Sequence, residues 1–326
     1  MKAFFRSTGA LVASALGLFA GATVVQALAG PTLDEGVRNN FAHFVQHRDS
    51  INVVFVGSSR IGSNISPASF DARMSELGQA TNSFNFWLGA MSAEESRRIV
   101  HEILRDEPRP SLLVVELLPA HGGIRDYAMF SDRNLWWRSL GNLHTVAGDL
   151  IANGSTAGVI NHGKLTFVRL FRVGKGGYIV DRVRWGEPAA RPVKHTGHKA
   201  LRDRWGSFDD GEFMIGRVAA TLRRAPASEE LLKPYLRFKS QIMDIVGNSA
   251  EIMFILPPGS PLPPSNLRQD PSVLVTNDPD RYPSLYEPAK WADINHLKEE
   301  AAQEHARLLA ESVQSRFNGY RSLATR

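Results

Sequence analysis

The fold is decided by residues 51–119, where three short apolar runs alternate with two helical segments. The runs are INVVFVGSSR at 51–60, SFNFWLG at 83–89 and SLLVVELLP at 111–119. Each is rich in β-branched and aromatic residues and meets Gly or Pro where it stops, which is typical of buried strands. Because the intervals suit crossover helices, the stretch predicts a β-α-β-α-β unit and a parallel sheet.

Both intervening segments carry helix start and stop signals. Ser66 and Pro67 begin one predicted helix, which Gly78 ends. The next helix starts at the capping-box sequence Ser92-Ala-Glu-Glu95 and ends before Pro108. Local chemistry alone therefore predicts where both crossover helices begin and end.

Regular structure returns near the C-terminus. Helices are predicted over about 228–246 and about 296–317, and EIMFIL at 251–256 is a fourth strand candidate. From about 120 to 225 no clean periodicity is visible, so this segment is predicted to be an insertion or cap over the core. Residues 30–326 are therefore interpreted as one α/β domain with a single insertion.

The insertion contains a strongly basic stretch. Residues 161–205 contain eleven Lys or Arg residues against three acids, a formal charge of +8. Trp185, Trp205 and Tyr178 are interleaved with the charges. Two interpretations stay open: a surface that binds anionic sugars or lipid headgroups, and a solvated, charge-rich loop region.

The N-terminal segment has the pattern of an export signal. Lys2 and Arg6 precede an uncharged, mostly apolar run over residues 8–29. Ala27-Leu28-Ala29 fits the small-x-small cleavage pattern, and the run is also long enough to span a bilayer as an uncleaved anchor. We therefore expect an exported protein that is either periplasmic or tethered to the outer face of the inner membrane.

The composition excludes several kinds of active site and partner. The 326 residues include no cysteine, which excludes disulfides, cysteine nucleophiles and cysteine metal ligands. A net charge of +5 is too small to indicate nucleic acid as a partner. His195 and His198 have no acidic or cysteine partner nearby, so neither a metal site nor a cofactor is expected.

Two short blocks carry the groups of a serine-based active site. Gly57-Ser58-Ser59-Arg60 follows the first predicted strand, at the sheet edge where sites form in parallel α/β proteins. Asp293 and His296 lie three residues apart at the predicted start of the last helix. A serine needs a base to remove its proton, and the base needs an acid to orient it. We therefore expect Ser59 as nucleophile, with Ser58 as the alternative.

Attack by a serine creates an oxyanion, which needs preorganised N–H donors. The backbone N–H of Ser59 is one candidate donor. Gly89 is another, because it ends the second predicted strand at the same sheet edge and a glycine lets substrate approach the backbone closely.

These blocks resemble those of the SGNH (GDSL-type) hydrolases. Members of that superfamily have a three-layer α/β/α sandwich with a mostly parallel sheet. Their serine follows the first strand, a glycine block the second and an Asn block the third, and an Asp-x-x-His block lies near the C-terminus. The resemblance implies that Ser59 is the nucleophile, Gly89 an oxyanion donor, Asp293 the orienting acid and His296 the base.

The resemblance covers roughly 51–119 and 251–317, with three departures. Position 58 is Ser where the family has Asp, position 60 is Arg where it has Leu, and Glu116 and the residues after it replace the Asn block. The usual asparagine donor is therefore missing or supplied elsewhere. The candidates for it, and for substrate binding, are Arg60, Asn64 and Asn85.

The sequences FVGSSRIGSNISPASFD and FNFWLGAMSAEE are most similar to exported, membrane-tethered SGNH-like proteins of bacterial envelopes. The resemblance implies an O-acyl esterase or O-acyltransferase that acts on an envelope polysaccharide through an acyl-enzyme on Ser59. The substrate would be an envelope glycan or acyl donor, and a membrane-bound O-acyltransferase is the candidate partner. The alternatives are a catalytically degenerate accessory subunit of a polysaccharide modification or export complex and a secreted lipase or esterase.

Overall fold

The computed structural model describes residues 35–120, 140–152, 154–171, 229–260, 265–293 and 295–324, together with Gly17, Ala20, Gly21 and Val24. The chain divides into two compact units. Residues 39–120 and 192–326 form the larger unit, which contains the sheet and both predicted site blocks. Residues 1–38 and 121–191 form the other.

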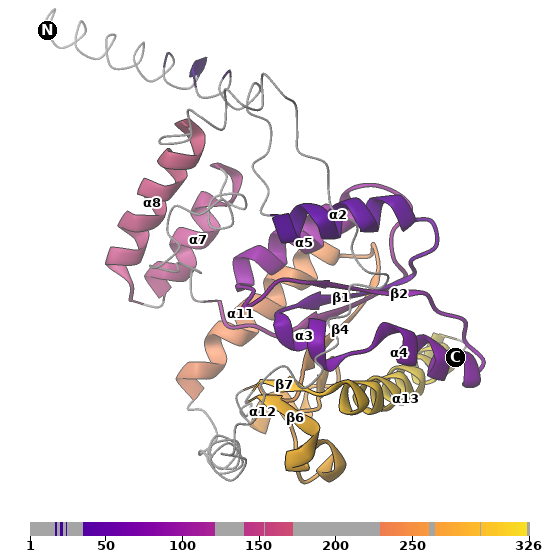
Figure 1. Ribbon diagram of the computed structural model, residues 1–326. Helices are drawn as coiled ribbons and strands as arrows, with labels where there is room; N and C mark the ends of the chain where they lie inside the picture. The colour runs from indigo at the N-terminus through magenta and orange to yellow at the C-terminus, as the bar shows by residue number, and fades with distance from the viewer. Residues whose placement is uncertain are drawn as a thin grey trace, which may run out of the picture. The chain divides into compact units, whose positions relative to one another are not determined.

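The larger unit is built on a five-stranded parallel sheet (Figure 1). Its strands are β1 (Val53–Gly57), β2 (Ser83–Trp87), β3 (Leu112–Glu116), β4 (Glu251–Leu256) and β5 (Val273–Val275). They lie in the order β2-β1-β3-β4-β5, and every neighbouring pair is parallel. In this order the chain leaves β1 in one direction to form β2 and then returns to the other side of β1 to form β3. The carboxyl ends of β1 and β3 therefore flank a topological switch point, where α/β folds place their sites.

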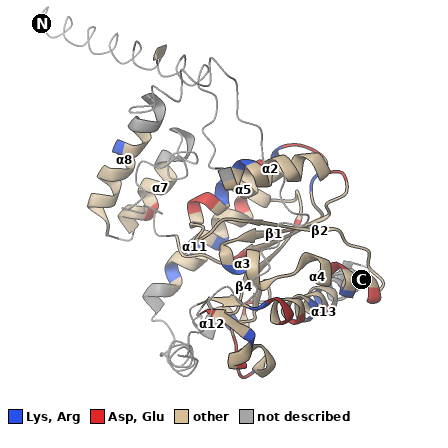
Figure 2. Ribbon diagram, in the orientation of Figure 1, with Lys and Arg blue, Asp and Glu red and all other residues tan. Residues whose placement is uncertain are grey.

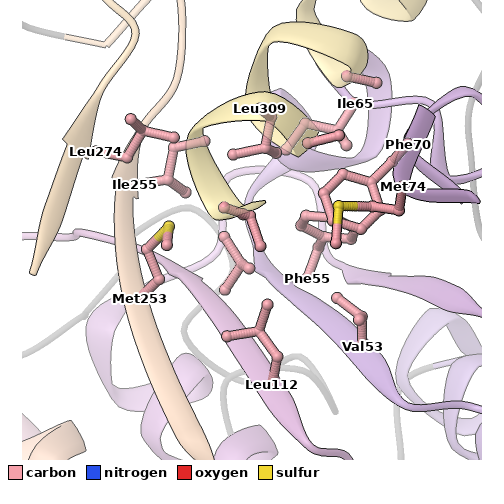
Figure 3. Close-up of a cluster of buried hydrophobic side chains, with 14 of the residues drawn as sticks. Val53, Phe55, Ile65, Phe70, Met74, Leu112, Met253, Ile255, Leu274 and Leu309 are labelled. Carbon is pink, nitrogen blue, oxygen red and sulfur yellow. The ribbon is translucent and has the colours of Figure 1, made fainter. Parts of the chain in front are cut away.

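One face of the sheet is covered by α3 (Ser59–Asn64), α4 (Pro67–Glu76) and α13 (Glu299–Ala324). Side chains alternate along a strand, so every second strand residue points to this face. Phe55, Met253 and Leu274 meet Phe70 of α4 and Leu309 of α13 in a buried cluster (Figure 3). A fully buried aromatic side chain of this kind contributes about 3–5 kcal/mol to stability.

The opposite face is covered by α5 (Ala93–Arg105), α11 (Glu229–Val246) and the part of α2 (Glu35–His47) that belongs to this unit, from Asn39 on. The unit is therefore a three-layer α/β/α sandwich (Figure 1). The alternate strand positions point to this side, and Val54 and Phe86 among them are fully buried. Phe41 of α2 packs edge-on against Phe86 with ring centroids 4.6 Å apart. The predicted α/β class and parallel sheet are thus confirmed.

The helix signals in the sequence are confirmed where they are local. Ser66 caps α4 by accepting the Ser69 N–H, and Ser92 and Glu95 form both hydrogen bonds of a capping box at α5. Helix α11 ends at Val246, and Gly247 follows with a positive φ of 50°. The sequence did not predict α2, the short α3 or β5, each of which depends on neighbours that lie far away in the chain.

The segment without clean periodicity contains two helices, α7 (Leu140–Ala152) and α8 (Thr156–Phe171), which pack against each other in the smaller unit. Residues 172–205 of the basic stretch lie outside the described residues, as do His195 and His198. In the larger unit both charge signs are interspersed on the helices (Figure 2). On α4 and α13, for example, Arg73 pairs with Glu76 and Glu311.

The predicted export segment, residues 1–29, also lies outside the described residues apart from Gly17, Ala20, Gly21 and Val24. Among the residues that are described, no helix combines the length and the apolarity needed to cross a bilayer.

Candidate active site

The nucleophile block lies in the turn between β1 and α3. Gly57 ends β1, and Ser58 caps α3 by accepting the Arg60 N–H on its hydroxyl at 3.2 Å. Ser59 is the first residue of α3 and is half-buried. A side chain at position 57 would collide with Glu116, whose carboxylate would lie 2.6 Å from the new Cβ. Glycine there lets the loop pass directly over the end of β3.

Ser59, His296 and Asp293 are in hydrogen-bond contact. The Ser59 Oγ lies 2.8 Å from His296 Nε2. On the other side of the ring, His296 Nδ1 lies 2.7 Å and 2.9 Å from the two carboxylate oxygens of Asp293. Since Asp293 accepts the Nδ1 proton, Nε2 is left as the acceptor for the serine hydroxyl. This is the relay that activates a serine nucleophile.

The carboxylate of Asp293 is kept ionised by hydrogen bonds from residues of its own turn. Burial alone would raise the pKa of Asp293, but hydrogen bonds from the His296 ring and the Asn295 N–H, 2.8 Å away, outweigh it. The pKa of Asp293 therefore lies below its ordinary value. Ionised at neutral pH, this carboxylate can orient the imidazole and stabilise the imidazolium that forms during attack.

One expectation about this block was wrong. Asp293 and His296 are not at a helix start but in a small antiparallel hairpin of β6 (Trp291–Asp293) and β7 (His296–Leu297), and α13 begins only at Glu299. The spacing of three still puts both side chains together, because Asp293 and His296 are paired across the hairpin.

Asn64 fixes this hairpin against α3. Its amide nitrogen donates to the carbonyls of Pro258 and Asn295 at 3.0 and 3.1 Å, and its Oδ1 accepts the Leu297 N–H at 2.8 Å. Asn64 is fully buried. The side chain suggested for substrate binding is thus enclosed in this structure and hydrogen-bonded to the backbone on either side of His296.

Asn85 is also enclosed. It is fully buried on β2 and donates to the carbonyls of Ile61 and Ile65 at 3.1 and 2.9 Å. This second side chain suggested for substrate binding is enclosed in the same way. Asn85 instead satisfies carbonyls at and just after the C-terminal end of α3, which have no partner within such a short helix.

Arg60 is held by the residue that takes the place of the Asn block. Glu116 ends β3, is fully buried and accepts the Ser58 N–H at 2.5 Å. Its other oxygen lies 2.8 Å from both Nε and Nη2 of Arg60. Arg60 also donates from Nη1 to the Gly259 carbonyl at 3.3 Å. The sequence departed from the family pattern at Glu116, but only the fold shows that this carboxylate organises the loop of Ser59.

The two backbone N–H groups predicted as oxyanion donors belong to Ser59 and Gly89. Ser59 is the first residue of α3, so its N–H has no acceptor within the helix. Gly89 lies in a turn directly after β2, where the Met91 N–H donates to the Leu88 carbonyl at 3.1 Å. Because Trp87 is paired with Gly57, Gly89 lies at the same edge of the sheet as the serine loop. Open space surrounds the position of a Cβ at Gly89.

A buried histidine of α13, His305, contacts the backbone of Asn64 and was not foreseen. His305 of α13 is fully buried, and its Nδ1 donates to the Asn64 carbonyl at 2.7 Å while Nε2 lies 2.9 Å from the Thr276 hydroxyl. Burial lowers the pKa of His305 to about 4, against the weaker opposing effect of the Asn64 hydrogen bond. His305 is therefore neutral at neutral pH, and nothing in its sequence surroundings distinguishes it from a solvated helical histidine.

No group of three or more His, Asp or Glu side chains among the described residues is arranged to hold a metal ion. Comparisons with protein-family models, with curated proteins and with solved structures find no significant match.

Proposed function

We propose that this protein is a serine-dependent esterase or O-acyltransferase of the SGNH class that acts on O-acyl groups of an envelope glycan. The observation that carries the proposal is the 2.8 Å contact between Ser59 Oγ and His296 Nε2, with Asp293 on the far side of the ring. The parallel sheet and the position of the serine after β1 agree with that class.

These three side chains are sufficient to transfer the acyl group of an ester to Ser59. The Ser59 oxygen bonds to the ester carbonyl carbon while its proton passes to His296 Nε2, and the carbonyl oxygen takes up the electron pair as an oxyanion. The carbonyl then re-forms, the bond to the alkoxy group breaks, and His296 returns the proton to the leaving oxygen. An acyl ester of Ser59 remains.

The second half of the reaction decides between esterase and transferase. Water or a sugar hydroxyl gives its proton to His296 and bonds to the acyl carbon. The bond to the Ser59 oxygen then breaks, and His296 returns the proton to that oxygen, which restores Ser59. Both outcomes need the same three residues and differ only in the acceptor. Incubating the protein with an acyl donor, with and without glycan, and following acyl-glycan and free acid separately, distinguishes them.

The proposal is tested by labelling and kinetics on the full chain. We expect a fluorophosphonate to modify wild-type protein at Ser59, and p-nitrophenyl acetate to be hydrolysed. Ser59→Ala and His296→Gln are expected to abolish both, with losses of more than about a thousandfold, and Asp293→Asn to lose about 10⁴ in kcat. Ser58→Ala, the control at the neighbouring serine, should still be labelled at Ser59. Equal inertness of wild type and variants on small esters and on glycan would refute an enzymatic role.

The second candidate is an accessory subunit with a degenerate site, and the replacement of the Asn block by Glu116 favours it. The accessory-subunit hypothesis predicts a folded protein that takes no label at Ser59 yet is still required for glycan acylation in cells. Complementing a deletion strain with Ser59→Ala separates the two: restored acylation supports the accessory role.

The envelope location rests on residues 1–29. Cell fractionation and N-terminal sequencing of the protein are expected to find it outside the cytoplasm, with a new terminus at Gly30 if the signal is cleaved and Met1 if it serves as an anchor.

A further inference from the structure

The oxyanion hole of the proposed site lacks the asparagine side chain expected after β3. Three side chains were candidates for a replacement donor, and two of them, Asn64 and Asn85, are fully buried with their amides bonded to backbone carbonyls. Arg60 is different: its side chain is about 20% exposed, and it directly follows Ser59 in the chain.

The guanidinium of Arg60 is fixed on two sides. Glu116 holds Nε and Nη2, and the Gly259 carbonyl accepts from Nη1. A guanidinium has five N–H donors, and these contacts use at most three, so N–H groups on the terminal nitrogens stay available. The side chain is therefore a preorganised donor whose charge is balanced by Glu116, rather than a mobile surface arginine.

Both anchors of the guanidinium belong to the site. Glu116 ends β3 beside β1, and its other oxygen holds the N–H of Ser58. Gly259 has a φ of 81°, and a Cβ there would lie 2.9 Å from the backbone of Asn295, next to His296. Arg60 thus contacts both the carboxylate that holds the serine turn and a loop residue that packs against the hairpin of His296.

We propose that Arg60 donates a hydrogen bond to the oxyanion formed on the ester carbonyl, and that Glu116 is the positioning residue that holds Arg60 in place. The inference rests on the proposed function. When Ser59 attacks, the carbonyl oxygen gains the electron pair of the C=O bond, and Arg60 stabilises that charge without transferring a proton. When the carbonyl re-forms, the interaction weakens and the alkoxide leaves with the proton from His296.

The test measures kcat and KM for p-nitrophenyl acetate, a neutral ester that offers no anionic group for an arginine to bind in the ground state. We expect Arg60→Ala to lower kcat by about 10²–10³ with KM changed by less than about threefold, the loss typical of a missing oxyanion donor. Arg60→Lys keeps the charge without the planar fork and should lose nearly as much. Guanidinium ion in the buffer is expected to restore part of the activity of Arg60→Ala.

Two controls keep the result interpretable. Arg73→Ala removes an arginine that also pairs with two acids, Glu76 and Glu311, but on the surface of α4, and should leave kcat unchanged and show no guanidinium rescue. Arg60→Ala leaves Glu116 buried without its cation, so the double variant Arg60→Leu/Glu116→Gln removes the guanidinium and the buried charge together. It should fold and be as slow as Arg60→Ala.

The outcomes separate the two proposals. If wild type is active and the folded double variant keeps its kcat, or if only KM rises, the oxyanion role of Arg60 is overturned while the proposed function stands. If wild type is inert and Ser59 takes no label, the proposed function fails, and the role of Arg60 fails with it.

Discussion

Helices α3 and α5 both begin at a serine whose N–H is accepted by a carboxylate. They differ in where that carboxylate comes from. At α5, the Ser92 hydroxyl accepts the Glu95 N–H and the Glu95 carboxylate accepts the Ser92 N–H at 2.8 Å. At α3, the Ser58 hydroxyl accepts the Arg60 N–H, but the carboxylate that accepts the Ser58 N–H belongs to Glu116, 58 residues away.

The two acids come from different places in the chain. In α5 the acid comes from the helix itself, so the cap is complete locally. In α3 the acid comes from β3, so the helix is bound to the sheet and the next serine, Ser59, faces His296. In both caps a carboxylate accepts the N–H of the capping serine, but only the remote carboxylate ties the serine loop to its neighbouring strand.

The largest difference between the two helix starts is expected when their acids, Glu116 and Glu95, are removed in turn. Glu116→Ala leaves Arg60 without its carboxylate and the buried Ser58 N–H without an acceptor, so we expect a loss of about 3–5 kcal/mol in the free energy of unfolding. Glu95→Ala should cost about 1–2 kcal/mol. Urea denaturation of both variants measures the difference. Equal losses would mean that the remote carboxylate has no special weight in the fold.

Low pH is expected to lower the stability of the fold through His305, which is hydrogen-bonded to the last residue of α3, Asn64. The folded pKa of His305, about 4, lies below the ordinary 6.5, so the unfolded chain binds the proton first. Stability therefore rises with pH between about 4 and 6.5, and acidification through that window removes up to about 3 kcal/mol. Urea midpoints at about pH 7 and about pH 5 test this. His305→Gln should flatten the slope, whereas His101→Gln, on the exposed face of α5, should not; an unchanged slope in His305→Gln would contradict the assignment.

The hairpin that presents His296 depends on the end of α3, so it offers a third test. Asn64→Ala leaves the Leu297 N–H and the carbonyls of Pro258 and Asn295 without their partner, for an expected loss of about 2–3 kcal/mol. Because a small displacement of the base is costly, kcat should fall by about 10² while KM changes little. Asn64→Asp keeps the acceptor for Leu297 but turns a buried carboxylate oxygen toward the carbonyls of Pro258 and Asn295, so it should lose at least as much stability as Asn64→Ala. A variant with lower stability but unchanged kcat would show that the hairpin holds its position without Asn64.

The smallest effect is expected at the two capping serines. Ser92→Ala and Ser58→Ala each remove one capping hydroxyl and should each lower the free energy of unfolding by about 1 kcal/mol. Thermal unfolding measures the losses, and ester hydrolysis should persist in both variants. A much larger loss in Ser58→Ala would show that its hydroxyl contributes beyond the cap.

Much of the fold follows from the sequence because its signals are local. The apolar runs at β1, β2, β3 and β4 were predicted within a few residues, and so were α4, α5 and α11. The short α3 was not, since six residues carry no periodicity and depend on Glu116 and Asn85 for their end groups. The β6–β7 hairpin was mistaken for a helix start because Asp is also a common helix cap.

The sequence by itself determined that strands alternate with helices, that a serine follows the first strand, and that Asp293 and His296 lie within reach of each other. Tertiary structure alone decided which asparagines are enclosed, which acid completes the cap of α3, and where Arg60 is held. The reason is physical: apolar periodicity and capping act over a few residues, whereas burial and the pairing of a carboxylate with a guanidinium depend on groups that only the packed sheet brings together.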